Sequence, residues 1–260
     1  MLQFLIHQCL HAQVPRDHYR ELTKTAAATS LNGLFEASSL PLRSSSPFYE
    51  YFSLYGPCHV VPEGGSNLLG VCGCSETLFT EDEWCHDIAA VACGTGATLA
   101  GLAAGAAPGQ QVIGFPVLKA GGFVESDAAV LLHQGLGHPL ASTNRMQLYL
   151  DAHYGGYAKV NARLIAFLRR FYATTGVKLD PIYTGKLLLA IYEMAEAGQL
   201  QQCARRQRPS LLNSSTLCQQ PSSRQDDSEA IRVLAIHTGG LQGITGVELR
   251  MGEVIFPEAI

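Results

Sequence analysis

Residues 88–118 read IAAVACGTGATLAGLAAGAAPGQQVIGFPVL, and this stretch decides the fold class. The apolar run Ile88–Ala92 predicts a strand, and Val112–Leu118 predicts a second one. The small residues between them predict a helix that Pro108–Gly109 ends. The glycine turn Gly94-Thr95-Gly96 joins the first strand to this helix. A strand, helix and strand in this order are typical of an α/β protein with a parallel sheet.

The glycine turn has the composition of an anion-binding loop. Glycine lets the backbone approach a ligand closely, and the first N–H groups of the following helix have no intrahelical partner. Such N–H groups, at the positive end of the helix dipole, bind phosphate. Thr95 and Thr98 add two hydroxyl donors to the same turn. We therefore predict a phosphate-binding loop after the first strand.

The kind of phosphate ligand follows partly by exclusion. A dinucleotide fingerprint needs a third glycine and an acidic residue at the end of the second strand, but that strand ends in Lys119. The Gly-Lys-Ser/Thr of a P-loop is also missing from the turn. A cofactor with one phosphate monoester remains, and pyridoxal phosphate is the commonest. A strand-to-helix junction that binds nothing also stays open, because small residues serve plain helix packing as well.

The bulk composition excludes some classes of partner. The chain has 260 residues, a net charge of −4 and a pI near 6.1, so it lacks the basic surface that nucleic-acid binding requires. Its eight cysteines, without signal-peptide features, indicate reduced thiols in a cytoplasmic protein. Residues 86–107 are too rich in glycine, alanine and threonine for a membrane span. We expect a soluble protein that has no nucleic-acid or membrane partner.

The chain is expected to contain an ordered core and two irregular stretches. Residues 1–56 are predicted to be an irregular remnant that precedes the core, with Met1–Ala12 resembling the middle of a domain and Thr23–Ser46 lacking any period. Residues 57–260 form the predicted core. Within it, residues 201–229 are polar and without periodicity, and we predict a mobile insertion there.

The elements predicted in the core follow from local patterns. Cys58–Val61 is a short strand, and Pro62–Asn67 is a turn whose role is either ligand approach or plain connection. Further along the chain, the sequence predicts a turn at Lys119–Phe123, a short helix at Ala128–Gly135, an amphipathic helix at Asn161–Thr175, another from Lys186 to about Gly198, and a strand at Ile231–Ile236. The last strand runs into the glycine turn HTGGLQG, at the edge where α/β proteins bind ligands.

A cluster of cysteines invites comparison with zinc sites. Cys72-Gly73-Cys74 lies between Cys58-His59 and Cys85-His86. These spacings match no common zinc motif, and two cysteines separated by one residue are too close for the usual chelating turn. We favour thiols of the protein core over a metal site.

Five motifs together resemble the 1-aminocyclopropane-1-carboxylate deaminase and D-cysteine desulfhydrase family. They are PEGGSN at 62–67, CGTGATLAGL at 93–102, YGGYA at 154–158, LDPIYTGK at 179–186 and IHTGGLQG at 236–243. The resemblance implies pyridoxal 5'-phosphate as cofactor. It also implies the two-domain fold of tryptophan synthase β subunits, which is fold type II of the pyridoxal-phosphate enzymes. The chain would hold mostly the large domain, a three-layer parallel sheet, truncated at its N-terminal side.

The resemblance also implies roles for individual residues. The phosphate would bind to Gly94, Thr95, Gly96, Ala97 and Thr98, in agreement with the prediction from the glycine turn. Tyr183 would lie beside the cofactor ring, Tyr157 would be a second active-site tyrosine, and Thr238 would face the pyridine nitrogen. Thr184 stands where the aminocyclopropane deaminases have glutamate, and this favours D-cysteine as substrate. The expected partners are a small amino-acid substrate and a second copy of the chain in a homodimer.

One feature of the family is missing from the sequence. The lysine that bonds the cofactor lies in a Gly-Asn-Lys motif well upstream of PEGGSN, as does a Ser-Asn-His substrate motif, and neither motif occurs here. The lysines present are Lys24, Lys119, Lys159, Lys178 and Lys186. We expect Lys186 to cap or flank a helix. The sequence thus predicts either a pyridoxal-phosphate lyase that lacks its first part, or a degenerate, non-catalytic member; in both cases the chain as given is predicted to be inactive.

Overall fold

The computed structural model describes residues 63–76, 86–107, 109–136, 146–205 and 231–257. The chain divides into two compact units, Met1–Glu63 and Gly64–Ile260, and the elements below form the second unit apart from Glu63. The predicted strand Cys58–Val61, the expected irregular stretch before it, and Cys58 and Cys85 lie outside the described residues.

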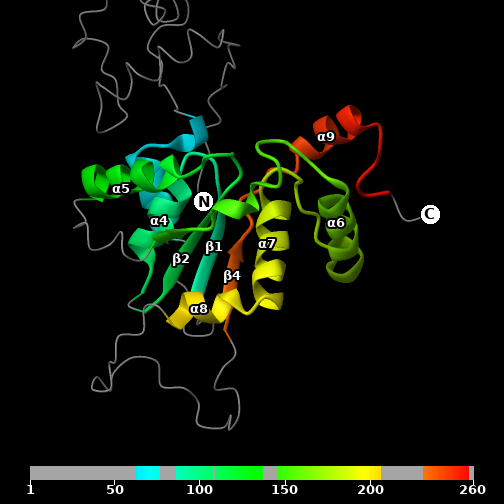
Figure 1. Ribbon diagram of the computed structural model, residues 1–260. Helices are drawn as coiled ribbons and strands as arrows, with labels where there is room; N and C mark the ends of the chain where they lie inside the picture. The colour runs from blue at the N-terminus through cyan, green and yellow to red at the C-terminus, as the bar shows by residue number, and fades with distance from the viewer. Residues whose placement is uncertain (1–62, 77–85, 108, 137–145, 206–230, 258–260) are drawn as a thin grey trace, which may run out of the picture. The chain divides into compact units, whose positions relative to one another are not determined.

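The unit is built on a sheet of four parallel strands (Figure 1). They are β1 (Ile88–Cys93), β2 (Gln111–Pro116), β3 (Met146–Leu148) and β4 (Val233–Ile236), in the order β3-β2-β1-β4. Every residue of β1 and β2 is buried, as expected for central strands of a parallel sheet covered on both faces. Three of the four strands were predicted, each within two residues of its observed bounds; β3, only three residues long, was not.

The strand β4 completes the sheet by pairing with β1. Ile88 lies opposite Val233, and the register continues to Val91 opposite Ile236. At the start of this pairing the backbone N–H of Arg232 donates a hydrogen bond of 2.9 Å to the carboxylate of Asp87. The two strands are thus joined by contacts between residues 145 positions apart in the sequence.

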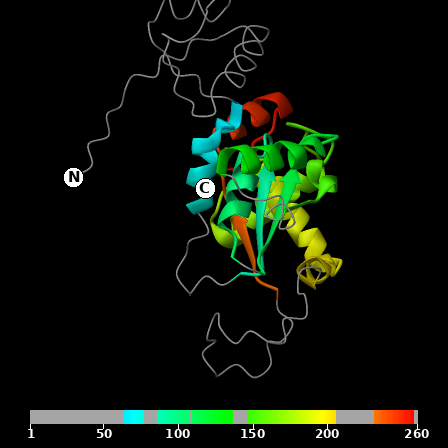
Figure 2. The same ribbon diagram turned by 90° about the vertical axis from the view of Figure 1, so that its left-hand side faces the viewer.

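Helices α3 (Leu68–Ser75), α4 (Ala97–Gly105) and α5 (Phe123–Leu136) cover one face of the sheet, and Figure 2 shows the green α5 in front of the strands. The helix α4 ends before Pro108–Gly109, as predicted. The helix α5 begins five residues earlier than the predicted Ala128. Its first turns hold exposed polar residues that resemble a loop, while Val124, Ala128 and Leu132 form a buried stripe at helical spacing.

Short helix α3 was not predicted, because its sequence LLGVCGCS shows no amphipathic period. It begins at Asn67, whose side chain accepts a hydrogen bond of 2.9 Å from the N–H of Gly70. It packs tightly on α4: a Cβ on Gly101 would lie 2.3 Å from the Cβ of Cys74, and a Cβ on Gly105 would lie 2.0 Å from the carbonyl of Ser75. The glycines of α4 thus serve helix packing as well as the turn before it.

The opposite face is covered by α7 (Thr184–Glu196), α8 (Gln199–Arg205) and η5 (Leu150–His153). With helices on both faces of the sheet, the unit has the three layers expected of this class. The helices α6 (Ala162–Thr175) and α9 (Gly243–Met251) lie outside α7 (Figure 1). The prediction of a loop from Gln201 was wrong for its first residues. These residues are helical because Leu200 and Cys203 pack against the sheet; 206–230 lie outside the described part.

The helices of the described ranges include none that is long and apolar enough to cross a membrane. Within the same ranges, no group of three or more histidine, cysteine, aspartate or glutamate residues is close enough to hold a metal ion.

Candidate cofactor site

The carboxyl ends of the four parallel strands meet at one edge of the sheet, where α/β proteins bind ligands. The loops that follow β1, β2 and β4 carry the glycine motifs at residues 94–96, 119–122 and 237–243. The segment before α7 reaches the same edge, because a Cβ on Gly94 would lie 3.4 Å from the hydroxyl of Tyr183 and a Cβ on Gly240 would lie 2.9 Å from the carboxyl carbon of Asp180. Three of the five sequence motifs therefore meet here.

The loop after β1 has the geometry of an anion site. Gly96 has a left-handed backbone with φ of 89° and forms the N-cap of α4, and no side chain caps the helix. The first intrahelical bond runs from the N–H of Ala100 to the carbonyl of Gly96. The N–H groups that precede Ala100 in the helix therefore have no intrahelical acceptor, and the first turn contains no acidic residue. Thr95 and Thr98 are half-buried beside them.

The PEGGSN turn lies directly against this loop. A Cβ on Gly64 would lie only 2.5 Å from the hydroxyl oxygen of Thr95, and Gly64 has a φ of 67°. Glycine is thus required at position 64 both for the backbone conformation and for space. This contact brings a fourth motif to the same edge.

Cys93, the residue before the loop, is buried at the end of β1, and burial raises the pKa of its thiol to about 12. The thiol is therefore neutral at physiological pH and serves as a core residue.

The two predicted tyrosines lie next to each other. The rings of Tyr157 and Tyr183 meet edge to face with centroids 6.1 Å apart. Tyr183 is half-buried near Gly94, whereas Tyr157 is 52% exposed. Tyr183 therefore lies beside the glycine loop, and Tyr157 lies next to Tyr183 with much of its surface exposed.

Asp180 is the organising residue of the segment before α7, and sequence reasoning did not single it out. It is fully buried, and one carboxylate oxygen accepts hydrogen bonds from the N–H groups of Ile182 and Tyr183, at 2.9 Å and 2.7 Å. The other accepts from the N–H and the hydroxyl of Thr184, at 2.8 Å and 2.6 Å. An aspartate ahead of a helix start is a capping signal that the sequence contained.

Thr184 and Thr238, two of the predicted cofactor residues, differ in accessibility. Thr184 is 1% exposed, and its hydroxyl donates to Asp180 and accepts from the N–H of the same residue at 3.0 Å. It therefore acts in the structure as part of the cap of α7. Thr238 is exposed in the loop after β4. The cofactor roles of Thr184 and Thr238 stay predictions.

Lys186 differs from the prediction that it caps or flanks a helix. It lies in the first turns of α7 with no exposed surface, and its ammonium donates hydrogen bonds to the carbonyls of His153 and Gly156, at 2.8 Å and 2.7 Å. Burial lowers the pKa of this amine to about 8, against the opposing effect of nearby Asp180. Lysine is rarely buried, so its residue type suggested an exposed position. The sequence contains no pattern that links Lys186 to the YGGY turn.

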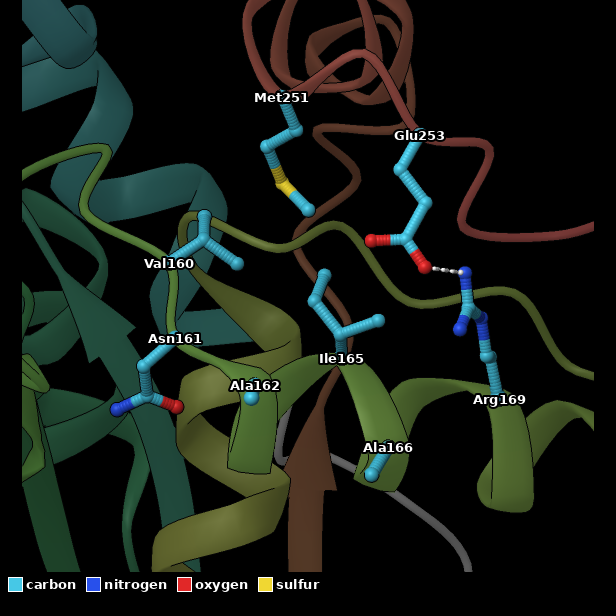
Figure 3. A pocket seen from close by; sticks show the side chains of 8 residues that line it. All are labelled: Val160, Asn161, Ala162, Ile165, Ala166, Arg169, Met251 and Glu253. Atoms are coloured by element: carbon cyan, nitrogen blue, oxygen red, sulfur yellow. Dashed lines mark hydrogen bonds and ion pairs between the residues drawn. The ribbon is translucent and has the colours of Figure 1, made fainter.

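A hollow of about 300 Å³ lies away from this edge, between α6 and the chain after α9 (Figure 3). Its rim carries an ion pair of 2.7 Å between Arg169 and Glu253, and Ile165 and Met251 face its interior. It is lined by none of the predicted site residues. The hollow therefore belongs to the packing of the C-terminal segment on α6.

Comparison with known proteins identifies a similar fold and distantly related sequences. No family model matches the chain. The crystal structure of an ACC deaminase homologue superposes with a TM-score of 0.54 at 23% identity, over 78% of this chain and 56% of the other. The fold is thus an α/β fold with a parallel sheet of the kind found in that protein.

Several curated proteins are similar to this chain in sequence. A putative 1-aminocyclopropane-1-carboxylate deaminase of Pyrococcus horikoshii is 27% identical over 194 residues, which are 71% of this chain and 50% of that protein. A mitochondrial bifunctional D-cysteine desulfhydrase and 1-aminocyclopropane-1-carboxylate deaminase of Arabidopsis thaliana is 30% identical over 197 residues, 72% of this chain and 42% of the relative. D-cysteine desulfhydrase of Klebsiella pneumoniae is 30% identical over 145 residues, 52% and 44% of the two chains.

The chain is therefore distantly homologous to the 1-aminocyclopropane-1-carboxylate deaminases and D-cysteine desulfhydrases. It spans about half the length of the curated relatives that it matches.

Proposed function

We propose that the chain binds pyridoxal 5'-phosphate at the carboxyl edge of its sheet. The observation that supports this proposal best is the glycine loop, in which left-handed Gly96 opens α4 and leaves the first N–H groups of the helix without intrahelical acceptors. A phosphate monoester fits this loop because two hydroxyls flank the N–H groups and no acidic residue lies in the first turn. Membership in the family supports the same cofactor.

Each residue at the edge has a role in this proposal. Gly94, Thr95, Gly96, Ala97 and Thr98 would hold the phosphate, and Thr238 would face the ring nitrogen. When bound, the cofactor supplies an electron sink that stabilises negative charge at the carbon next to the amino group of a substrate. Tyr183 would position the ring and move protons at its hydroxyl oxygen, and Tyr157 would shield the ring from water on the exposed side.

The proposed reaction class is that of a D-cysteine desulfhydrase. In that reaction D-cysteine and water give pyruvate, ammonia and hydrogen sulfide. Thr184, in the place where the resemblance puts glutamate in aminocyclopropane deaminases, favours this substrate. Its hydroxyl is engaged with Asp180, so its influence on a substrate would be exerted through the cap that positions Tyr183. Aminocyclopropane carboxylate is the second substrate of the class.

A non-catalytic member that binds a phosphate-bearing molecule is the alternative. It is favoured by the missing Gly-Asn-Lys motif, because covalent pyridoxal catalysis needs a lysine amine at the aldehyde carbon. Both proposals assign the same phosphate loop, and they differ only in whether the protein turns over a substrate.

A binding experiment tests the shared part. Pyridoxal phosphate and, separately, inorganic phosphate would be titrated into the full chain and into Thr95→Val and Thr98→Val, which remove one hydroxyl each at nearly constant volume. We expect each variant to bind both ligands more weakly, by about tenfold for a lost hydrogen bond to a charged group worth ~1.4 kcal/mol.

The matched control is Thr174→Val, which removes an exposed hydroxyl that bonds only carbonyls of α6. This variant should bind like the wild type. Equal affinity of all four proteins, or no binding by the wild type, would refute the proposed site.

A further inference from the structure

The YGGY turn between η5 and α6 holds an unfavourable backbone. Tyr154 and Ala158 have φ of 45° and 54°, and the two glycines between them have φ of 101° and 115°. Left-handed conformations of residues with side chains persist only where the surroundings enforce them. Within the turn, two backbone bonds, Gly156 to His153 and Lys159 to Gly156, contribute to this. The ring of His153 also accepts a hydrogen bond from the N–H of Gly155, and Arg250 of α9 donates one to the carbonyl of Ala158. Further constraints come from α7.

Two side chains of α7 hold the turn. The buried ammonium of Lys186 donates to the carbonyls of His153 and Gly156, which lie on either side of Gly155. Further along α7, Glu193 accepts a hydrogen bond of 2.9 Å from the hydroxyl of Tyr154. It also forms an ion pair of 2.8 Å with Arg163 of α6. A buried lysine with two carbonyl acceptors is a strong and directional tether.

The same helix also sets Tyr183. This residue stands at the N-cap position of α7, and Asp180 binds its N–H. Tyr157 is more than half exposed and makes its ring contact with Tyr183, so its place is determined by the turn that carries it. Tyr183 is thus fixed at the start of α7, and the turn that carries Tyr157 is bonded to the same helix through Lys186.

We infer that Lys186 is a positioning residue: through the carbonyls of His153 and Gly156 it holds Tyr157 against Tyr183, on the open side of the cofactor site. The significance for the cofactor rests on the proposed function, whereas the placement of Tyr157 does not. Lysine suits this role because its alkyl chain fills the core while three N–H donors remain at its end. The lowered pKa of the amine agrees with this burial.

Fluorine NMR of the full chain labelled with 3-fluorotyrosine tests the inference. The chain has ten tyrosines, and the Tyr157 resonance is assigned from its loss in Tyr157→Phe. In Lys186→Met, which keeps the length of the side chain and removes its donors, we expect the Tyr157 resonance to move toward the value of the unfolded chain. Pyridoxal phosphate should shift this resonance in the wild type and not in Lys186→Met, while inorganic phosphate still binds both proteins.

The control is Lys159→Met, which removes an exposed ammonium from the same turn and should leave the Tyr157 resonance unchanged. If Lys186→Met does not fold, Tyr154→Phe decides, because it removes only the hydroxyl bound to Glu193 and should move the Tyr157 resonance in the same direction. An unmoved resonance in a folded Lys186→Met, or in Tyr154→Phe where that variant decides, overturns the inference. If the Tyr157 resonance moves in these variants but the wild type does not respond to pyridoxal phosphate, the inference is supported and the proposed function is refuted.

Discussion

Gly96 is the residue on which the proposed phosphate loop depends most directly. Its φ of 89° is a conformation that a β-branched residue adopts only with strain, and a Cβ there would lie 3.1 Å from the carbonyl of Val124. We predict that Gly96→Val weakens the binding of pyridoxal phosphate and of inorganic phosphate by roughly tenfold or more, since losing ~1.4 kcal/mol of interaction has that effect. Isothermal titration of both ligands measures it.

Gly109→Val provides the matched control for this change. Gly109 has a φ of 88°, so the strain is the same, but no atom lies within 4 Å of its added Cβ and it precedes β2 at the other edge of the sheet. This variant should keep its affinity for phosphate. If both variants lose affinity equally, general strain and not the loop explains the result.

Cys93 gives a second prediction for a single residue. Because burial raises the pKa of its thiol to about 12, it should resist alkylation in the folded chain. Iodoacetamide at pH 8, followed by peptide mapping, should label the half-buried Cys72 and Cys74 before Cys93. Labelling of Cys93 should appear only with denaturant. Fast labelling in the native state would show that the end of β1 opens readily.

At the scale of elements, the start of α7 depends on its cap. Thr184→Val removes the hydroxyl that donates to the carboxylate of Asp180 and accepts from the backbone N–H of Asp180. Both residues are buried, so these groups would be left without this partner. We predict a loss of about 1–3 kcal/mol in the free energy of unfolding, the usual cost of leaving buried polar groups unpaired. Urea denaturation measures the loss. Thr174→Val, on the exposed side of α6, should lose much less; equal losses would mean that the cap contributes little.

The elements also show what sequence patterns can and cannot predict. The helix α6 was predicted almost to the residue, because Leu164, Ile165 and Leu168 recur at helical spacing and Asn161 caps its start. The helix α3 has no such period, and its glycine and cysteine residues resemble a loop. It is helical because it packs against the glycines of α4, a contact between distant segments that local patterns do not contain.

The site shows the same division. The glycine loop was predicted from its own residues, because strand, turn and helix are neighbours in the sequence. The contacts of Lys186 with His153 and Gly156 span 33 and 30 positions, and no local spacing indicates them. The charge of Lys186 led to the expectation that it caps or flanks a helix, since lysine usually lies on the surface.

For the whole molecule, Lys186 predicts how stability depends on pH. Its pKa is about 8 in the folded chain and 10.5 ordinarily, so between these values the unfolded state binds more protons. The free energy of unfolding that this residue contributes therefore rises with pH above 8. Below pH 8 both states are protonated and this dependence disappears.

Urea denaturation of the wild type and Lys186→Met at pH 7.5 and pH 9.5 measures this effect. The wild type should gain stability relative to the variant at the higher pH. Other groups, such as Cys93, titrate alike in both proteins and cancel in the difference. A difference that does not change with pH would contradict the depressed pKa.

The second prediction for the whole molecule is that the 260-residue chain is catalytically silent. None of its five lysines lies in a Gly-Asn-Lys motif, and Lys186, whose pKa is lowered to about 8, donates hydrogen bonds to two carbonyls. Borohydride reduction with pyridoxal phosphate should trap no adduct at a single lysine, and D-cysteine should yield no pyruvate. An adduct at one site with steady pyruvate release would show that another lysine serves as the catalytic amine.

The pairing of β4 with β1 has a consequence for the order of folding. The strands β1 and β2 are separated by one short helix, whereas Arg232 and Asp87 meet across 145 positions. Closing the longer loop costs more chain entropy and depends on contacts formed earlier, so we expect β4 to join the sheet late. The contact of Gly240 with Asp180 would then form in the same late step. A nascent or partly folded chain would therefore possess its phosphate loop before the edge around it is complete.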